Sequence, residues 1–221
     1  MTELASMIDH TLLSPQSTEA EITQLCSEAK EYGFKSVCVA PHFVSLAKSL
    51  LLESEVLVCT VIGFPLGYST TSTKVHETSE AISNGADEID MVINNALLKD
   101  SLMDQVTADI AAVVKAAEGK TVKVILETCL LEPYAIALAC ECATKAKAHF
   151  VKTSTGFSKS GATIEAVKLM KENIAPTMQI KASGGIRSLE VAQLMIEAGA
   201  TRLGTSSSLV LIGKSNKEKN Y

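Results

Sequence analysis

The chain has 221 residues, of which 47% are hydrophobic and 20% charged, so it can bury a substantial core and has the length of one α/β barrel. Tryptophan is absent and aromatic residues make up only 4%, so aliphatic side chains must build that core. The formal net charge of −5 argues against a general nucleic-acid-binding protein, which carries a basic surface.

The sequence also argues against membrane, secretory and metal-binding classes. No apolar stretch reaches the length of a membrane span, and residues 1–10 lack the basic region and apolar run of a secretory signal. The six cysteines and four histidines show no metal-ligand spacing. We therefore expect a cytoplasmic protein with reduced thiols, no metal, no cofactor and no membrane or nucleic-acid partner. A homodimer is compatible with this composition.

Short β-type runs alternate with stretches of helical periodicity along the chain. The predicted strands cover residues 5–9, 36–40, 56–62, 87–93, 122–127, 149–153, 178–182 and 201–205. Thr18 and Glu21 predict a capping box at the start of a helix that ends near Gly33. Eight strands, each followed by a helix and without a linker, predict a single α/β domain, a (β/α)₈ TIM barrel over residues 1–213. A polar tail over residues 214–221 follows it.

Two lysines stand in unusual places, because Lys152 and Lys181 each end a short apolar stretch and precede small residues and glycine. A lysine is seldom buried unless its charge is paired or given up. Burial disfavours the ammonium form, and a second nearby cation disfavours it further. One of the two amines can therefore be neutral at about pH 7. A neutral amine is a nucleophile that forms a Schiff base with a carbonyl compound. The pair is therefore the predicted centre of an active site.

Other unusual polar residues fall at comparable positions on the predicted strands. Asp9 ends the first strand, Cys38 lies near the end of the second, and Asp90 lies within the fourth. Catalytic groups of such barrels project from the C-terminal ends of the strands, so we expect these side chains to converge with the lysines at one mouth.

Asp90 shares one face of its strand with Glu88 and Val92, by the alternation of side chains. Its carboxylate can hold an ammonium group or carry protons to and from a reacting carbon, and a structural salt bridge to one of the lysines is the alternative. The Cys38 thiol either lines the pocket or serves as a buried spacer.

Glycine and hydroxyl residues cluster after the last two predicted strands. Gly184 and Gly185 follow the seventh strand, and Ser206 and Ser207 follow the eighth. Barrels that bind phosphorylated substrates commonly hold the phosphate in these two loops. Glycine allows backbone N–H groups to approach the phosphate, and serine hydroxyls add donors, although ordinary turns have the same composition. We predict a phosphorylated substrate.

These motifs together resemble the deoxyribose-phosphate aldolase family of class I aldolases, which are lyases. The resemblance runs along nearly the whole chain, through residues 8–11, 37–39, 61–67, 88–92, 125–128, 151–157 and 181–187. It implies the reversible cleavage of 2-deoxy-D-ribose 5-phosphate to D-glyceraldehyde 3-phosphate and acetaldehyde, in the catabolism of deoxyribose phosphate. The implied partners are therefore a phosphorylated sugar and aldehydes.

The resemblance also implies residue roles. Lys152 would form the Schiff base, Lys181 would keep it neutral and join in proton transfer, and Asp90 would donate or accept the proton through a water. Substrate and phosphate binding would fall to Thr155, Gly156, Gly184, Gly185, Ser206 and Ser207.

The chain departs from familiar family members at two phosphate positions. Phe157 stands where some relatives carry a lysine that could meet the phosphate, and residues 207–209 replace a loop richer in glycine. Some members also have a C-terminal tyrosine that can close over the site. Tyr221 is therefore a candidate for proton transfer, with a disordered end as the alternative.

Three other functions fit parts of the pattern. Another Schiff-base aldolase, transaldolase-like or acting on a keto acid, would share Lys152. A phosphate-binding isomerase would use acid–base chemistry alone, with both lysines serving electrostatics. A non-catalytic barrel that binds a sugar phosphate would normally lose Asp90, Lys152 or Lys181, and all three are present.

Overall fold

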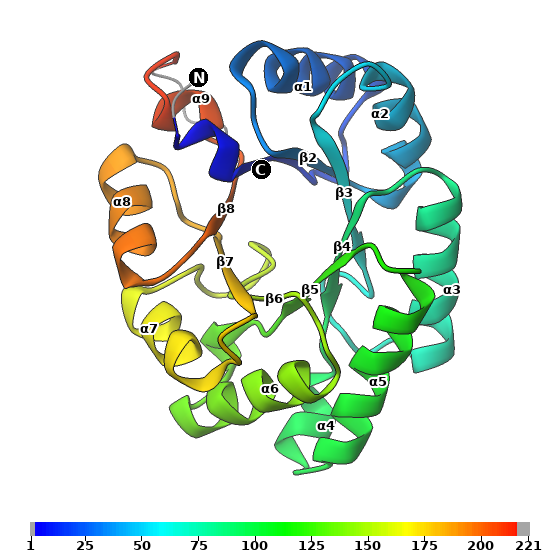
Figure 1. Ribbon diagram of the computed structural model, residues 1–221, viewed down its shortest axis with the longest axis vertical. Helices are drawn as coiled ribbons and strands as arrows, with labels where there is room; N and C mark the ends of the chain where they lie inside the picture. Colours follow the sequence, from blue (N-terminus) through cyan, green and yellow to red (C-terminus); the bar gives the residue numbers. More distant parts are fainter. Residues whose placement is uncertain (1–2, 216–221) are drawn as a thin grey trace.

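Eight parallel strands close into a barrel in chain order, with β1 paired to both β2 and β8. The structure is a computed structural model that describes residues 3–215, so Tyr221 and most of the predicted tail lie outside the described residues. Figure 1 looks along the barrel and shows the helices on its outside. The predicted (β/α)₈ barrel is confirmed.

The strands are β1 (Ile8–Leu12), β2 (Ser36–Val39), β3 (Leu57–Ile62), β4 (Glu88–Val92), β5 (Thr121–Ile125), β6 (Phe150–Lys152), β7 (Gln179–Ser183) and β8 (Arg202–Thr205). The α-helices are α1 (Glu19–Tyr32), α2 (Val44–Leu50), α3 (Thr71–Ser83), α4 (Asn95–Lys99), α5 (Met103–Ala116), α6 (Pro133–Lys145), α7 (Ile164–Asn173), α8 (Leu189–Ala198) and α9 (Ser208–Leu211). Short 3₁₀ helices are η1 (Ala5–Met7), η2 (Pro41–Phe43) and η3 (Thr128–Leu130).

The first helix begins and ends as its sequence predicts. The Thr18 hydroxyl accepts the backbone N–H of Glu21, and the Glu21 carboxylate accepts the backbone N–H of Thr18 at 2.8 Å, which completes the capping box. Gly33 ends the helix in the left-handed conformation, with φ of 69°.

The first strand is the one element whose predicted position is wrong by several residues. Residues 5–7 form η1, and the strand begins at Ile8 and runs on to Leu12. The apolar residues before Ile8 suggested a strand, but the residues that pair with β2 and β8 run from Ile8 to Leu12 and include the polar Asp9, His10 and Thr11. Their polarity is tolerated because buried partners satisfy it. Asp9 contacts Lys181 and Arg202, and is the second residue of β1 instead of its last.

The largest apolar core lies between the barrel strands and the surrounding helices, and is built mainly from Ile, Val, Leu and Ala. The inside of the barrel differs, because Lys123 and Lys181 are among the largest fully buried side chains of the described residues. Branched apolar residues usually fill such an interior. The barrel interior of this protein is therefore partly ionic, where apolar side chains would be expected. No helix within residues 3–215 is long and apolar enough to cross a membrane.

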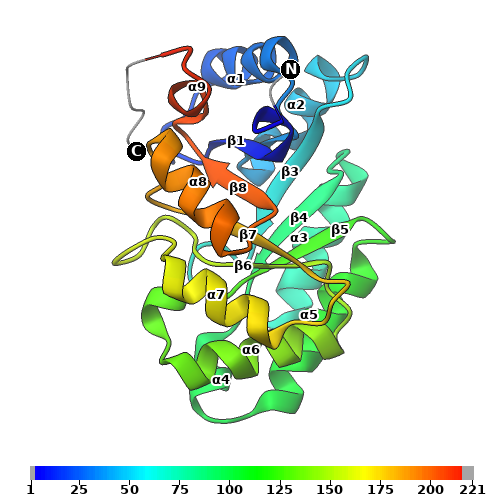
Figure 2. The same cartoon turned by 60° about the vertical axis from the view of Figure 1, so that its left-hand side comes forward.

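His10 ties the first strand to two helices. Its ring lies 2.8 Å from Glu28 of α1 through Nε2 and 2.9 Å from the Ser208 hydroxyl of α9 through Nδ1. Figures 1 and 2 both show α9 beside α1 and α8 at the rim of the barrel. His10 is thus a buried packing residue, and it anchors the helix that follows the β8 loop.

Candidate active site

Asp90 is the centre of a buried ionic cluster inside the barrel. Its Oδ2 atom accepts hydrogen bonds from Lys152 Nζ at 2.8 Å and from Lys181 Nζ at 2.7 Å, and its Oδ1 atom accepts one from Lys123 Nζ at 2.8 Å. These residues come from β4, β6, β7 and β5, which lie side by side in the sheet. The structure therefore brings the three principal predicted residues together and adds Lys123.

Two further carboxylates and a guanidinium extend the cluster toward the start of the strands. Asp9 contacts Lys181, and its other oxygen accepts from Arg202 at 2.7 Å. Glu88 lies 2.7 Å from Lys123 Nζ and 3.0 Å from an Arg202 nitrogen. Since all these side chains are buried, their charges must be balanced by one another.

The balance leaves an excess of one positive charge when every group is ionised. The cluster contains four cationic side chains and three carboxylates. The cations are Lys123, Lys152, Lys181 and Arg202, and the carboxylates are Asp9, Glu88 and Asp90. Loss of one proton makes the group neutral. A buried site with surplus positive charge favours an amine that gives up its proton.

The pKa values of the central groups are held by their neighbours. Burial alone would raise the pKa of Asp90, but the ammonium groups of Lys123, Lys152 and Lys181 outweigh burial and hold it well below its ordinary value. Burial would lower the pKa of Lys181, but the carboxylates of Asp9 and Asp90 outweigh it and hold this pKa above its ordinary value. At neutral pH, therefore, Asp90 is an anion and Lys181 a cation.

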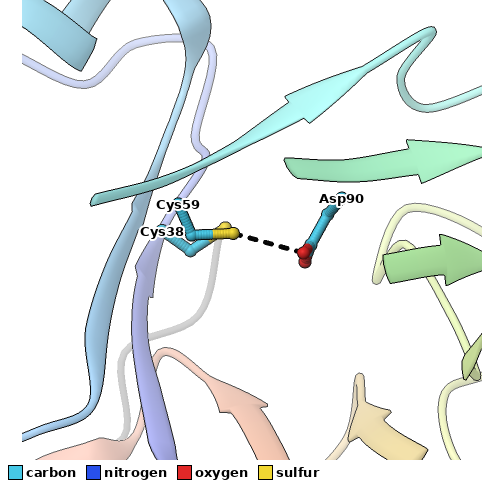
Figure 3. A group of neighbouring side chains, drawn as sticks. All are labelled: Cys38, Cys59 and Asp90. Atoms are coloured by element: carbon cyan, nitrogen blue, oxygen red, sulfur yellow. Dashed lines mark hydrogen bonds between the residues drawn. The ribbon is translucent and has the colours of Figure 1, made fainter. Parts of the chain in front are cut away.

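Two thiols lie beside the Asp90 carboxylate. Cys38 and Cys59 are register partners on β2 and β3, and the Cys59 thiol donates to Asp90 Oδ1 at 3.2 Å (Figure 3). Burial raises the pKa of the Cys59 thiol well above its ordinary value, so it stays a neutral donor. Cys38 is fully buried and is absent from the pocket lining, which agrees with the spacer interpretation.

Cys38, Cys59 and Asp90 are close enough together to hold a metal ion, as are Asp9, Cys59 and Glu88. The cations of the same cluster already occupy the carboxylate oxygens in both sets. A divalent ion would have to displace ammonium groups and add charge to a site that is already positive. The chemistry of these donors therefore favours the lysines over a metal.

A pocket opens beside this cluster at the C-terminal ends of β6, β7 and β8. It is lined by Thr11, Leu13, Lys152, Thr155, Gly156, Ser183, Gly184, Gly185, Ile186, Arg187, Gly204, Thr205 and Ser206. Among the cluster's charged residues, only Lys152 belongs to this lining. Asp90 and Lys181 lie beneath it, fully buried.

Most, but not all, of the predicted binding residues line this pocket. Thr155, Gly156, Gly184, Gly185 and Ser206 all face the pocket, whereas Ser207 does not belong to its lining. The backbone N–H of Ser207 donates to the Thr205 hydroxyl at 2.9 Å.

One side chain joins the two glycine-containing loops. The Thr205 hydroxyl donates to the Ile186 carbonyl oxygen at 2.7 Å, so the loop after β8 is held to the loop after β7. Gly184 and Gly185 both have positive φ, of 82° and 76°. Phe157 lies outside the pocket lining and packs edge-on against Phe64, with ring centres 5.4 Å apart.

Five charged residues of this region were not predicted as site residues: Lys123, Glu88, Arg202, Glu127 and Arg187. Lys123 alternates with Val122 and Val124 along β5, which was a readable signal of an inward lysine. Glu127 gave no such signal, because it follows β5 in a left-handed conformation that sequence does not indicate for a glutamate.

The structure is a closed (β/α)₈ barrel whose lysine-rich ionic cluster borders a pocket at the strand ends. These features define the class of barrel enzymes that carry their catalytic side chains at the ends of the strands. The model of the DeoC/LacD family of aldolases matches residues 4–213. The chain belongs to this family.

Similar proteins agree with that assignment. Deoxyribose-phosphate aldolase 1 of Staphylococcus aureus strain MRSA252 is 58% identical over 214 residues, which cover 97% of each chain. Deoxyribose-phosphate aldolase 2 of S. aureus strain COL is 57% identical over 98% of this chain and 99% of its own. The solved tetrameric deoxyribose phosphate aldolase of Aeropyrum pernix superposes with a TM-score of 0.89 at 37% identity, over 95% of this chain and 89% of that one.

Proposed function

We propose that this protein catalyses the reversible cleavage of 2-deoxy-D-ribose 5-phosphate to D-glyceraldehyde 3-phosphate and acetaldehyde through a Schiff base on Lys152. Family membership and the near-full-length similarity to deoxyribose-phosphate aldolases support the reaction. The observation that carries the residue assignment is the position of Lys152. It borders the pocket, and Asp90 is the one carboxylate of the described residues within ion-pair distance of it.

The other two lysines are poorer nucleophiles on the same criteria. Lys181 contacts both Asp9 and Asp90, and Lys123 lies within 4 Å of Asp9, Glu88 and Asp90. Both side chains are fully buried, whereas that of Lys152 is 4% exposed. Lys152 therefore has the fewest carboxylate partners of the three lysines and is the one that faces the pocket, where its amine can attack the aldehyde carbon of the open-chain sugar.

The imine explains the rest of the chemistry. Once protonated, it withdraws electrons from the C2–C3 bond, so cleavage leaves a neutral enamine on Lys152 in place of a carbanion. The proton lost from the C3 hydroxyl must then reach C2, which requires a group that both accepts and donates. Asp90 and Lys181 supply an anion and a cation joined at one oxygen atom, and they are the proposed relay.

The loops after β7 and β8 are the proposed phosphate site. Gly184, Gly185 and Ser206 face the same pocket as Lys152, and Arg187 adds a cation to its rim. Positive φ at both glycines allows close approach of backbone groups to an anion. Ser207 is the weaker member of the set, because it does not belong to the lining.

Trapping tests this assignment. The protein is incubated with acetaldehyde, reduced with borohydride and digested, and the ethylated lysine is located by mass spectrometry. We expect modification of Lys152, its loss in Lys152→Ala, and its retention in Lys168→Ala, a variant of an exposed lysine on α7. Failure to trap any lysine would refute the Schiff-base mechanism, and would favour the acid–base isomerase alternative.

A homodimer in a reducing compartment is the proposed setting. The A. pernix relative is tetrameric, which supports self-association, and all six cysteines are free. Light scattering on the purified protein tests the subunit number.

A further inference from the structure

Glu127 is a buried carboxylate outside the ionic cluster, and it has an unusual backbone. It follows β5 with φ of 55° and ψ of 61°, a region that few residues other than glycine adopt. The backbone on both sides is fixed to the end of β6 and the residue after it. Leu126 N–H donates to the Lys152 carbonyl at 2.9 Å, and Thr128 N–H donates to the Thr153 carbonyl at 3.0 Å.

This backbone directs the Glu127 side chain at Thr155. Glu127 Oε1 accepts the Thr155 backbone N–H at 3.3 Å, and Glu127 Oε2 forms a short hydrogen bond with the Thr155 hydroxyl. The same hydroxyl oxygen accepts the Phe157 backbone N–H at 3.1 Å. A glycine at position 127 would adopt this backbone without strain but would leave Thr155 without its partner.

These bonds fix the direction of the Thr155 hydroxyl. The Thr155 hydroxyl donates its one proton to Glu127 Oε2, and each Glu127 oxygen also accepts the Thr155 backbone N–H, at 3.3 Å and 3.4 Å. A hydroxyl oxygen accepts two hydrogen bonds, and Phe157 supplies one of them. Thr155 therefore presents an acceptor, and no donor, to the pocket that it lines.

We propose that Glu127 is a positioning residue that makes Thr155 a reader of a substrate hydroxyl group. A phosphate group carries oxygen atoms that accept, so it gains nothing from Thr155, whereas a sugar hydroxyl can donate to it. This inference rests on the proposed function and deepens it, because it moves Thr155 from the phosphate subsite to the sugar subsite.

The position of Thr155 indicates which hydroxyl is read. It lines the same pocket as Lys152, where C1 would be bound, and precedes Gly156, whose Cα is 3.6 Å from the place of a Cβ on Gly184 in the proposed phosphate loop. The C3 hydroxyl gives its proton to the relay during cleavage. The C4 hydroxyl, which becomes the C2 hydroxyl of glyceraldehyde 3-phosphate, is the remaining donor between those two ends.

The test uses condensation with acetaldehyde and two acceptor aldehydes. D-glyceraldehyde 3-phosphate carries the hydroxyl, and 3-phosphooxypropanal lacks it. We expect the wild-type ratio of kcat/KM between the two acceptors to favour the hydroxylated one by about tenfold, the effect of one neutral hydrogen bond. In Glu127→Gln the amide donates to Thr155 Oγ1 and frees its proton for the pocket, so the ratio should approach one.

A double variant separates this role from a merely structural one. Thr155→Val should lose the preference, Thr155→Ser should keep it, and Glu127→Gln combined with Thr155→Val should match Thr155→Val alone. These Thr155 variants carry the test if Glu127→Gln does not fold. Equal losses with both acceptors, or an unchanged ratio in Glu127→Gln or Thr155→Val, would overturn the inference. A wild-type protein inactive with both acceptors would instead overturn the proposed function and this inference with it.

Discussion

Lys152 and Lys181 donate hydrogen bonds to the same atom, Oδ2 of Asp90, at 2.8 Å and 2.7 Å. The two amines are register partners on adjacent strands, yet their surroundings differ. Lys181 has Asp9 as a second carboxylate and is fully buried, whereas Lys152 opens onto the pocket. The shared oxygen therefore joins a lysine that contacts two carboxylates to a lysine that contacts one and faces the pocket.

Asp90→Asn should remove both stability and activity. An amide leaves Lys123, Lys152 and Lys181 without their common anion, and breaking a buried ion pair on one side costs about 3–5 kcal/mol. We expect the free energy of unfolding in denaturant at neutral pH to fall by about that amount. The rate of cleavage should fall at least about 100-fold, because the proton relay is lost.

The matched control for this change is Glu141→Gln. Glu141 forms an exposed pair with Lys145 at 3.8 Å on α6, and such a pair contributes less than about 1 kcal/mol. Asp90→Asn behaving like this control would mean that the buried lysines do not depend on the carboxylate.

Lys123→Met should shift the pH dependence of Schiff-base formation. Without Lys123, three cations face three carboxylates, so the cluster no longer carries the excess positive charge that favours a neutral amine. The pH at which borohydride trapping reaches half of its maximal rate should rise by about 1 or more. Trapping rates measured across a pH series give this value directly, and an unchanged or lower midpoint would contradict the charge balance.

Much of this arrangement could be predicted from the sequence. Apolar runs alternating with helical periodicity define the strand order, and in a barrel of parallel strands consecutive strands are neighbours. Lys152 and Lys181, at the ends of consecutive runs, had to come close, and their register pairing bears this out. Position within a strand was less secure, since Asp9 proved to lie near the start of β1, and Lys181 in the middle of β7.

The remaining residues depended on features that the sequence does not display. Arg202 begins β8 and looks like a surface charge until Asp9 and Glu88 are placed opposite it. Glu127 acts through a left-handed backbone, which is set by the bonds that its neighbours make to β6. The ion-pair partners of Arg202 and the backbone conformation of Glu127 depend on contacts between distant segments, so local sequence patterns do not predict them.

Asp9→Asn should change how stability depends on pH. Burial would raise the pKa of Asp9, but Lys181, Lys123 and Arg202 outweigh it and lower this pKa in the folded state from its ordinary value of 3.8. The unfolded chain therefore binds a proton at pH values where the folded protein does not, and the contribution is lost as pH falls through that window. We expect the stability difference between wild type and Asp9→Asn to be constant above about pH 5 and to shrink below about pH 4. Denaturant titrations across this range check it, and a difference that grows on acidification would contradict it.

Gly184→Ala should weaken recognition of the phosphate more than recognition of the sugar. Gly184 has φ of 82°, and a Cβ there would lie 2.9 Å from the Cα of Gly161, so the loop must shift. We expect KM for 2-deoxyribose 5-phosphate to rise about tenfold, equivalent to about 1.4 kcal/mol, with a smaller change for unphosphorylated 2-deoxyribose.

Gly119→Ala provides the control, because Gly119 has the same φ of 82°, and apart from its chain neighbours no atom of residues 3–215 lies within 4 Å of its Cβ position. It lies between α5 and β5, away from the pocket lining. Both variants carry the backbone strain of a left-handed alanine, about 1 kcal/mol, so both should lose stability. Only the change at position 184 should alter the ratio of the two KM values. An equal rise for both sugars in Gly184→Ala would assign the loop to general stability, and the phosphate would then have to bind elsewhere in the pocket.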